Sequence, residues 1–324
     1  MITRQLISQI GALQTKRQIC VLGAAIIDLV MKTPRLPHSG EDISLSQHER
    51  HIGGCAFNIA LMLKRLELNS YNALPIGNGV WANEVSQMMG YHNISSVLSN
   101  PDGDNGWCLA LVEPSGERTF LTIEGVENTW NWEILNQLKI EKDALIYLSG
   151  YQLTSNTGET ILDWLESLTI PFTLFIDFGP RISKLNKEIL TRLFAFKPIL
   201  SVNRQEAQFL GLNTQSSDLK LSVQNFAKMW FDMYETPIIV RLDCLGAYCY
   251  EKEEQTWTDI FPVKVIDTIG AGDNHAGGVL AALSANWSLA DAVLLGNAVA
   301  SYVVGQSGAD CSPTKEQLIK HIRH

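Results

Sequence analysis

The sequence lacks cysteines arranged in pairs. Its six cysteines are scattered through 324 residues, with no CxxC motif and no histidines at matching spacing, as Cys20, Cys55, Cys108, Cys244, Cys249 and Cys311. Structural zinc sites need such spaced ligands, and small secreted domains need many cysteines at disulfide-forming positions. The pattern therefore argues against both classes and predicts a protein of the reducing cytoplasm.

Long apolar runs and clusters of basic residues are also missing. No window holds about 18 uninterrupted apolar residues, the length that a membrane-spanning helix needs. The first apolar run, Cys20 to Ile27, ends at Asp28 and follows the polar segment 14–18, so it does not resemble a signal peptide. The formal net charge is −9 and no block of Lys or Arg stands out, which argues against nucleic acid as a partner. These absences predict a soluble globular protein that interacts with neither membrane nor nucleic acid.

What the chain does contain is a regular alternation of apolar strands and amphipathic helices. Strand-like runs at 18–27, 144–150, 172–177, 198–202 and 237–242 are separated by helical patterns at 53–66, 156–167, 183–194, 203–210 and 219–235. Further helices are predicted at 272–285, 289–304 and 314–323. Strands that alternate with helices form a mainly parallel sheet covered on both faces. The expected fold is an α/β three-layer sandwich with a mainly parallel central sheet.

Two segments break this alternation. Residues 34–52 are polar and lack helical periodicity, and residues 105–124 contain two strand-like runs joined by Pro114-Ser115-Gly116, which is typical of a hairpin. We expect them to form a small β-sheet lid over the edge where such folds bind ligands. Segments 18–33, 53–104 and 125–324 are then the core, and 1–17 is an N-terminal extension with a helix near 3–13.

The stretch DTIGAGD, residues 267–273, carries the strongest chemical signal. A strand-like run at 261–266 precedes it, and a helix follows. Gly270 and Gly272 let the backbone approach a ligand closely, and the N–H groups at a helix N-terminus attract anions. Such a turn suits a phosphoryl group in transfer. Asp273 beside it predicts a base that removes a proton from an attacking hydroxyl, with a simple helix cap as the alternative.

Four motifs in order resemble the ribokinase-like (PfkB) carbohydrate kinase family, from about residue 18 to the end of the chain. DTIGAGD resembles the C-terminal signature of that family, and GGCAFNIALMLKRL, residues 53–66, resembles its N-terminal one. Asn203 and Glu206 match its N-x-x-E motif, and Asn297 falls where the family has an adenine-pocket asparagine. The resemblance implies the ribokinase-like fold and activity as a kinase.

The resemblance assigns roles to individual residues. Asp273 is implied as the general base, and Gly270, Ala271 and Gly272 as the anion hole. Asp267 is implied to help hold a monovalent cation, potassium, beneath this turn, with a turn-starting aspartate as the alternative. Glu206, together with Asn203, is implied to organise Mg²⁺ through water; the alternative is a helix N-cap with an acid three residues later. The remaining implied positions bind the substrate hydroxyls (Asp28, Gly53, Gly54, Asn58) or the nucleotide (Asn203, Glu206, Arg241, Gly246, Asn297).

The chain departs from the family pattern in four places, one of which is Gly77-Asn78 where the family often has G-D. The family usually continues D-x-F after its second aspartate, whereas this chain has Asp273-Asn274-His275. The nucleotide-side stretch T-x-G-x-x-G corresponds to residues 241–246, with Asp243 in place of glycine. Residues 177–181, DFGPR, resemble the D-x-N-x-R of ketose and keto-deoxy-sugar kinases; Arg181 binds phosphate or an acidic substrate on that comparison, and forms a surface ion pair otherwise.

The predicted function is transfer of the γ-phosphoryl group of ATP, with Mg²⁺, to a hydroxyl of a sugar or sugar acid. A nucleoside kinase of the same family is the alternative, followed by a non-catalytic sugar- or nucleotide-binding regulator. A dinucleotide oxidoreductase is disfavoured because the first strand offers only Gly23 where G-x-G-x-x-G is needed. The partner is a small molecule, and the exposed edges of a lid sheet predict a homodimer that pairs through the lid.

Overall fold

A computed structural model describes residues 2–45, 47–252, 254–308 and 310–323 of the protein. Its central sheet has eight strands in the order β12-β11-β10-β9-β8-β7-β1-β4. The strands are parallel except that β11 runs antiparallel to both β10 and β12. Their bounds are β1 Ile19–Leu22, β4 Tyr71–Ala73, β7 Ala144–Ser149, β8 Phe172–Asp177, β9 Ile199–Asn203, β10 Ile238–Arg241, β11 Ala247–Glu251 and β12 Glu254–Thr258.

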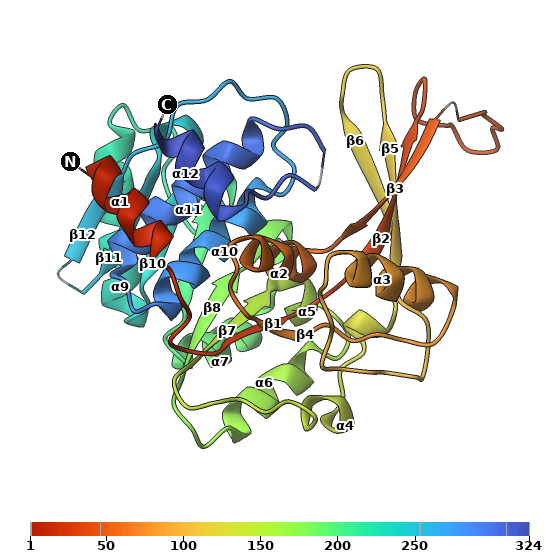
Figure 1. Ribbon diagram of the computed structural model, residues 1–324, viewed down its shortest axis with the longest axis horizontal. Coiled ribbons are helices and arrows are strands. Elements are labelled where there is room, and N and C mark those ends of the chain that lie inside the picture. Colours follow the sequence, from red (N-terminus) through yellow and green to blue (C-terminus); the bar gives the residue numbers. More distant parts are fainter. Residues whose placement is uncertain (1, 46, 253, 309, 324) are drawn as a thin grey trace.

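Helices cover both faces of this sheet, so the expected three-layer α/β architecture is confirmed (Figure 1). Side chains along a strand point alternately to the two faces. In β7, Leu145 and Tyr147 belong to one core, and Ile146 and Leu148 to the other. The first core also takes side chains from α1 Ile2–Gly11, α2 Cys55–Arg65, α3 Val80–Tyr91, α10 Ala271–Ser284, α11 Leu289–Val304 and α12 Lys315–Arg323. The second takes them from α4 Trp132–Leu135, α5 Gly150–Leu153, α6 Gly158–Ser167, α7 Lys187–Ala195, α8 Arg204–Phe209 and α9 Leu219–Tyr234.

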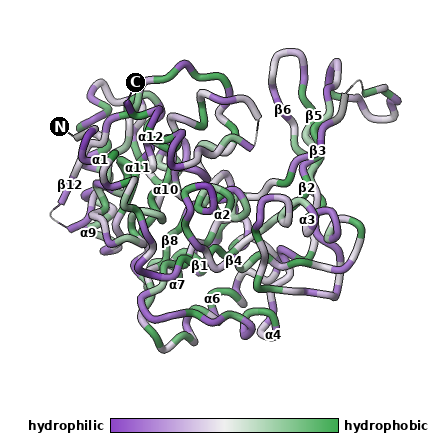
Figure 2. Tube along the Cα trace, in the orientation of Figure 1, coloured by the Kyte–Doolittle hydropathy of each residue, from purple (hydrophilic) through white to green (hydrophobic). Residues whose placement is uncertain are grey.

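The apolar residues concentrate along the central strands and the buried helices, as the hydropathy colouring shows (Figure 2). Leu6 and Ile10 of α1 are fully buried in the first core, where α1 packs against α12, so the N-terminal extension is part of the folded body. None of the helices in the described ranges is long and apolar enough to cross a membrane. All six cysteines, each within the described part of the chain, are free thiols.

A second sheet of four strands projects from this body (Figure 1). We call it the small sheet; its order is β3-β2-β5-β6, with β2 Ile26–Lys32, β3 Gln47–Gly53, β5 Trp107–Val112 and β6 Arg118–Ile123. Its existence was predicted, but β2 was not placed in it. The run at 18–27 was predicted as one core strand, whereas the chain leaves the central sheet after Leu22 and enters the small sheet at Ile26.

Buried polar groups fix the place where the small sheet joins the core. The side-chain amide of Asn105 donates to the carbonyl oxygens of Ala25, at 3.3 Å, and Pro75, at 3.0 Å. The carboxylate of Glu127 accepts from the backbone N–H groups of Gly106 and Gly125, both at 2.8 Å, and these glycines flank the β5–β6 hairpin. The junction is therefore held by two side chains, Asn105 and Glu127, that form hydrogen bonds with backbone groups.

Two further differences from the predicted elements bear on the site. Residues 261–266 form no strand, although β11 and β12 pair as expected, because Pro262 lacks an N–H and the apolar side chains Phe261, Val263 and Val265 line a cavity. Helix α3 was not predicted. Its N-terminal N–H groups on Trp81 and Ala82 bind the carboxylate of Asp104, a contact that links positions more than 20 residues apart.

Candidate active site

The Gly270–Asp273 turn begins helix α10. Gly270 is the N-cap residue and has φ 69°, in the left-handed region that favours glycine. No side chain caps this helix, so the backbone N–H groups of its first turn have no side-chain acceptor. Asp273 lies in the first turn without acting as the cap. The helix-cap interpretation of Asp273 therefore does not describe this structure.

The carboxylate of Asp273 contacts the second glycine-rich motif. The side-chain amide of Asn58, in the first turn of α2, donates to Oδ2 of Asp273 at 2.7 Å. Gly54 precedes α2 with φ 100°, and a Cβ there would lie 2.5 Å from the carbonyl oxygen of Ala24. The glycine therefore allows α2 to start close to the strand end. Helices α2 and α10 then pack together, which joins two motifs that are 215 positions apart.

Burial makes Asp273 a stronger base than an exposed aspartate. Burial raises the pKa of Asp273, and the hydrogen bonds from Asn58 and the Cys55 thiol act in the opposite direction. The charge of Asp177 raises it further, and Arg241 lowers it. A raised carboxyl pKa brings the group closer to the range in which general bases work best.

A second charged cluster lies beside the turn. Arg241, at the end of β10, donates from Nη2 to Oδ2 of Asp177 at 3.0 Å, and Nη2 lies 3.7 Å from Oε2 of Glu206. Burial and the charge of Asp177 raise the pKa of Glu206, while Arg241 lowers it. A Cβ on Gly272 would lie 2.8 Å from Nη1 of Arg241, so the guanidinium packs against the glycine turn.

Asn203 and Glu206 form the helix cap that the alternative interpretation expected. The Asn203 side chain accepts from the Glu206 N–H, and the Glu206 carboxylate accepts from the backbone N–H and side-chain amide of Asn203, at 2.9 and 2.6 Å. The capping role does not remove these residues from the site. Asn203 lines a cavity beside α10, and Glu206 faces Arg241.

That cavity, which we call the α10 cavity, has a volume of about 500 Å³. Its lining includes six of the residues predicted to bind nucleotide or to form the anion hole, namely Asn203, Arg241, Gly246, Ala271, Gly272 and Asn297. Asp243, which replaces a family glycine, has φ 53°, a left-handed conformation that aspartate tolerates better than most residues. Asp243 therefore adopts a backbone conformation that glycine also favours.

His275 and Asn297 lie together at the base of the α10 cavity. The Asn297 amide donates to the carbonyl oxygens of Thr258 and Asp259, at 3.1 and 3.0 Å, which leaves its oxygen to accept from Nε2 of His275 at 3.2 Å. Burial lowers the pKa of His275 to about 3, and the charge of Arg241 acts in the same direction. His275 is therefore neutral near pH 7, and it links α10 to α11.

A second cavity, the small-sheet cavity, lies between the small sheet and the start of the turn. Its volume is about 310 Å³, and Asp28, His51, Arg118 and Asp267 are among its lining residues. Burial raises the pKa of Asp28 to about 6, and His51 lowers it. A Cβ on Gly53 would lie 2.1 Å from Oδ2 of Asp28, so a larger residue at position 53 would displace this carboxylate.

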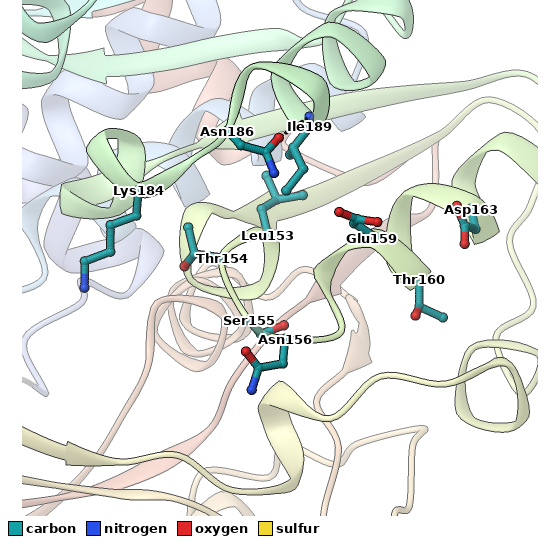
Figure 3. Close-up of a pocket in the computed structure, with 10 residues that line it drawn as sticks. All are labelled: Leu153, Thr154, Ser155, Asn156, Glu159, Thr160, Asp163, Lys184, Asn186 and Ile189. Atoms are coloured by element: carbon teal, nitrogen blue, oxygen red, sulfur yellow. Dashed lines mark hydrogen bonds between the residues drawn. The ribbon is translucent and has the colours of Figure 1, made fainter.

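A third cavity of about 530 Å³ lies elsewhere, around α5, α6 and the start of α7 (Figure 3). None of the sequence-predicted site residues lines it. Its polar groups already stabilise the fold, since Asn186 caps α7 and Asp163 pairs with Arg192 at 2.6 Å. Despite its size, it is a weaker candidate than the two cavities that are lined by residues of the 267–272 segment.

Some site residues were missed or misjudged from the sequence. Asp177 pairs with Arg241, whereas Arg181 of the same motif lies over the ring of Tyr151, 4.8 Å from its centroid, and 4.0 Å from Glu124. Cys55 was named only as part of the substrate motif, yet its thiol hydrogen-bonds Asp273. The local sequence gives no signal for either pairing. In the described parts of the chain, no three His, Cys, Asp or Glu side chains gather closely enough to hold a metal ion by themselves.

Known proteins resemble this chain in sequence and in fold. A model of the pfkB family carbohydrate kinases matches residues 16–315. A protein of Escherichia coli K12, described as the uncharacterized sugar kinase YegV, is 48% identical over 307 residues, which cover 95% of this chain and 94% of that protein. The ribokinase structure from Thermotoga maritima has a TM-score of 0.77 at 22% identity, over 95% of this chain and 100% of that one. The Arabidopsis thaliana ribokinase, complexed with ribose and ATP, has a TM-score of 0.71 at 19% identity, over 95% and 99%.

Proposed function

The chain belongs to the pfkB family of carbohydrate kinases, and on this premise we propose that it transfers the γ-phosphoryl group of ATP to a hydroxyl group of a sugar or sugar acid. Asp273 acts as the general base. The α10 cavity binds the nucleotide, and the small-sheet cavity binds the acceptor.

The observation that carries this proposal is the position of the glycine turn between the two cavities. Asp267 and Ile269 line the small-sheet cavity, and Ala271 and Gly272 line the α10 cavity. A phosphoryl group that passes from a nucleotide in one cavity to a hydroxyl in the other therefore crosses the N-terminus of α10. Asp273 stands in this first turn, held by Asn58.

The proposed reaction follows from these positions. The carboxylate of Asp273 takes the proton from the acceptor hydroxyl as its oxygen forms a bond to the γ-phosphorus. The bond from that phosphorus to the bridging oxygen breaks, and ADP leaves with the electron pair. The N–H groups at the start of α10 and the Arg241 guanidinium stabilise the charge that develops on the phosphoryl oxygens. Asp28 and Asn58 accept from and donate to the hydroxyls of the acceptor.

The charged cluster beside the turn fits a divalent cation. Asp177 and Glu206 are two buried carboxylates that share one guanidinium, Arg241, and the raised Glu206 pKa reflects burial and this excess of negative charge. Carboxylate oxygens and water are the ligands that Mg²⁺ prefers. Glu206 and Asp177 would hold Mg²⁺ through water, and the ion would neutralise charge on the nucleotide phosphates.

The small sheet supports two further parts of the proposal. It covers the acceptor cavity as a lid, which excludes water during transfer. Its edge strand β6 exposes Phe120, Leu121 and Ile123, each more than half exposed, to solvent. Exposed apolar edge strands favour pairing, so we propose a homodimer that forms through the small sheet. Sedimentation showing a strict monomer at micromolar concentration contradicts this part alone.

The function is tested with a panel of sugars, sugar acids and nucleosides, in which ADP release is measured with ATP and Mg²⁺. The proposal is supported if the wild type turns over a sugar or sugar acid at a rate far above that of the Asp273→Asn variant. Preferred turnover of a nucleoside supports the alternative kinase. Binding of a sugar without any turnover across the panel identifies a regulator and contradicts the proposal.

A further inference from the structure

Arg118 of the small sheet contacts Asp267, the first residue of the DTIGAGD segment. Nη2 of Arg118, the first residue of β6, lies 3.2 Å from Oδ2 of Asp267. Both side chains line the small-sheet cavity and are largely shielded, with 31% and 18% of their side-chain surface exposed. The pair connects two positions 149 residues apart and is a direct charge contact between the small sheet and the loop that leads into Gly270.

The Asp267 carboxylate is already surrounded by donors. Oδ1 accepts from the backbone N–H of Ile269 at 3.1 Å, and the N–H of Gly308 also donates to the carboxylate. Burial by itself raises the pKa of Asp267, but the Ile269 N–H and the Arg118 charge outweigh it, so the pKa is lowered. A carboxylate offers about four acceptor positions, and three are used here by groups of the protein.

These residues do not fit a monovalent cation at Asp267. A cation needs free carboxylate oxygens that face it, whereas here the oxygens face two N–H groups and a guanidinium. A cation added next to Arg118 would also place two positive charges around one carboxylate. The role that the family resemblance assigns to potassium therefore disagrees with the contacts of this chain.

We propose that Arg118 is a positioning residue that supplies the positive charge at Asp267 in place of a monovalent cation. The proposal rests on the proposed kinase function. Because the charge is attached to β6, it reaches the turn only when the small sheet lies over the cavity. Closure of the small sheet therefore also brings the positive charge that supports the Gly270–Gly272 turn. A freely diffusing cation would not couple these two events.

The strength of the contact suits a reversible latch. Partly exposed ion pairs shift an equilibrium by about 5-fold or less, which biases it without locking it. The small sheet can therefore open to exchange sugar for product. The same cavity is lined by the carboxylates of Asp28 and Glu49 and by Lys32 and His51. Removing Arg118 therefore leaves three carboxylates, with Asp267, against one lysine and one histidine, and creates a place that a cation from solvent can fill.

The test compares wild type, Arg118→Gln and a matched control, Arg50→Gln, in KCl and in tetramethylammonium chloride at equal ionic strength. Arg50 is also on the small sheet, but it pairs with Glu84 of α3 at 3.1 Å and does not line the cavity. We expect kcat/KM of wild type and Arg50→Gln to be the same in both salts. Arg118→Gln should lose about 2- to 5-fold in tetramethylammonium and recover in KCl.

Hydrogen exchange of the backbone at 266–270 provides a readout that does not need turnover. KCl should leave exchange unchanged in wild type and slow it in Arg118→Gln. The proposal is overturned if adding KCl slows exchange in wild type or raises its activity several-fold. It is also overturned if Arg118→Gln behaves like wild type in both salts. Lack of turnover on every substrate contradicts the kinase function, and the exchange result still decides the role of Arg118.

Discussion

Asn58 and Asp273 are joined by a hydrogen bond of 2.7 Å, although 215 positions separate them in the chain. Each residue lies in the first turn of a helix that begins at a glycine, and the two helices, α2 and α10, pack against each other. The contact brings an amide that can bind a sugar hydroxyl to the carboxylate that would deprotonate it. The site is thus built where two glycine-rich turns meet.

Asn58→Ala tests this pairing through the pH profile. The Asn58 amide lowers the pKa of Asp273 against the raising effect of burial. Without it the pKa rises further, so more of the base is protonated at a given pH and the acid limb of kcat/KM moves to higher pH. A hydrogen bond to a charged group is worth about 1.5–3 kcal/mol, which predicts a loss of roughly 10- to 150-fold in kcat/KM at low pH. An acid limb that stays in place contradicts the assignment.

Gly272→Ala tests the contact between the turn and Arg241. The added methyl would lie 2.8 Å from Nη1 of a guanidinium that is buried and paired with Asp177, so Arg241 has to move. We expect a higher KM for ATP and a lower kcat, with little change in the KM for the sugar. Gly90→Ala, at an exposed helical position where no atom lies within 4 Å of the new Cβ, is the matched control. Equal kinetics for the two variants would argue against the predicted anion hole.

His275 makes the protein less stable in acid. Its folded-state pKa of about 3 lies below its ordinary value of 6.5, so the unfolded chain binds the proton more readily. Stability from the neutral ring is present above pH 6.5 and is lost as the pH falls toward 3. Each pH unit in that window costs about 1.4 kcal/mol, or roughly 2 kcal/mol between pH 6.5 and 5.

The measurement is urea unfolding of wild type and His275→Gln at pH 7.5 and pH 5. Glutamine keeps a donor that can face Asn297 and does not titrate. Wild type should lose roughly 2 kcal/mol more than the variant over this interval. Identical losses would show that His275 does not titrate differently in the folded and unfolded states.

The sequence predicted an element wherever the spacing of its apolar residues matches the positions that are buried in the fold. Strands such as 172–177 and helices such as 219–235 were predicted within two residues, because their apolar positions face one of two cores. The run at 18–27 misled us because apolar residues continue through the bend at 23–25, where the chain passes between sheets. Within 261–266, the apolar side chains of Phe261, Val263 and Val265 line the α10 cavity, and periodicity cannot distinguish such a lining from a strand packed in a core.

The sequence predicted the motifs that contribute to the site, but not the side-chain contacts between them. The sequence named Asn58, Asp273, Asn203 and Glu206, and its resemblance to a family suggested roles for them. It gave no sign that Arg118 meets Asp267 or that Arg241 meets Asp177, because the partners of each pair lie in different elements, at positions 149 and 64 residues apart. Such contacts depend on the register of the sheets and on the angle of the small sheet, which local sequence does not encode.

Asp273→Asn should leave the fold as stable as wild type or more stable. The raised pKa of Asp273 means that the folded state favours the protonated carboxyl. The stability linked to that proton is fully present at pH values below the pKa of Asp273 in the unfolded chain, and it is lost as the pH rises through the pKa in the folded state. At pH 7.5 the ionised group therefore opposes folding. Asparagine removes this charge. A melting temperature several degrees below wild type at pH 7.5 would contradict the expected effect of burial.

The value of kcat for Asp273→Asn on the best substrate of the panel tests the central claim most directly. Asparagine has the same shape and can still accept from Asn58, but it cannot take a proton from the acceptor hydroxyl. The account predicts that kcat falls by roughly 10² or more while the KM for ATP and the melting temperature show no loss. A variant that retains near wild-type kcat would mean that another group, or none, removes the proton, and that Asp273 has only a structural role.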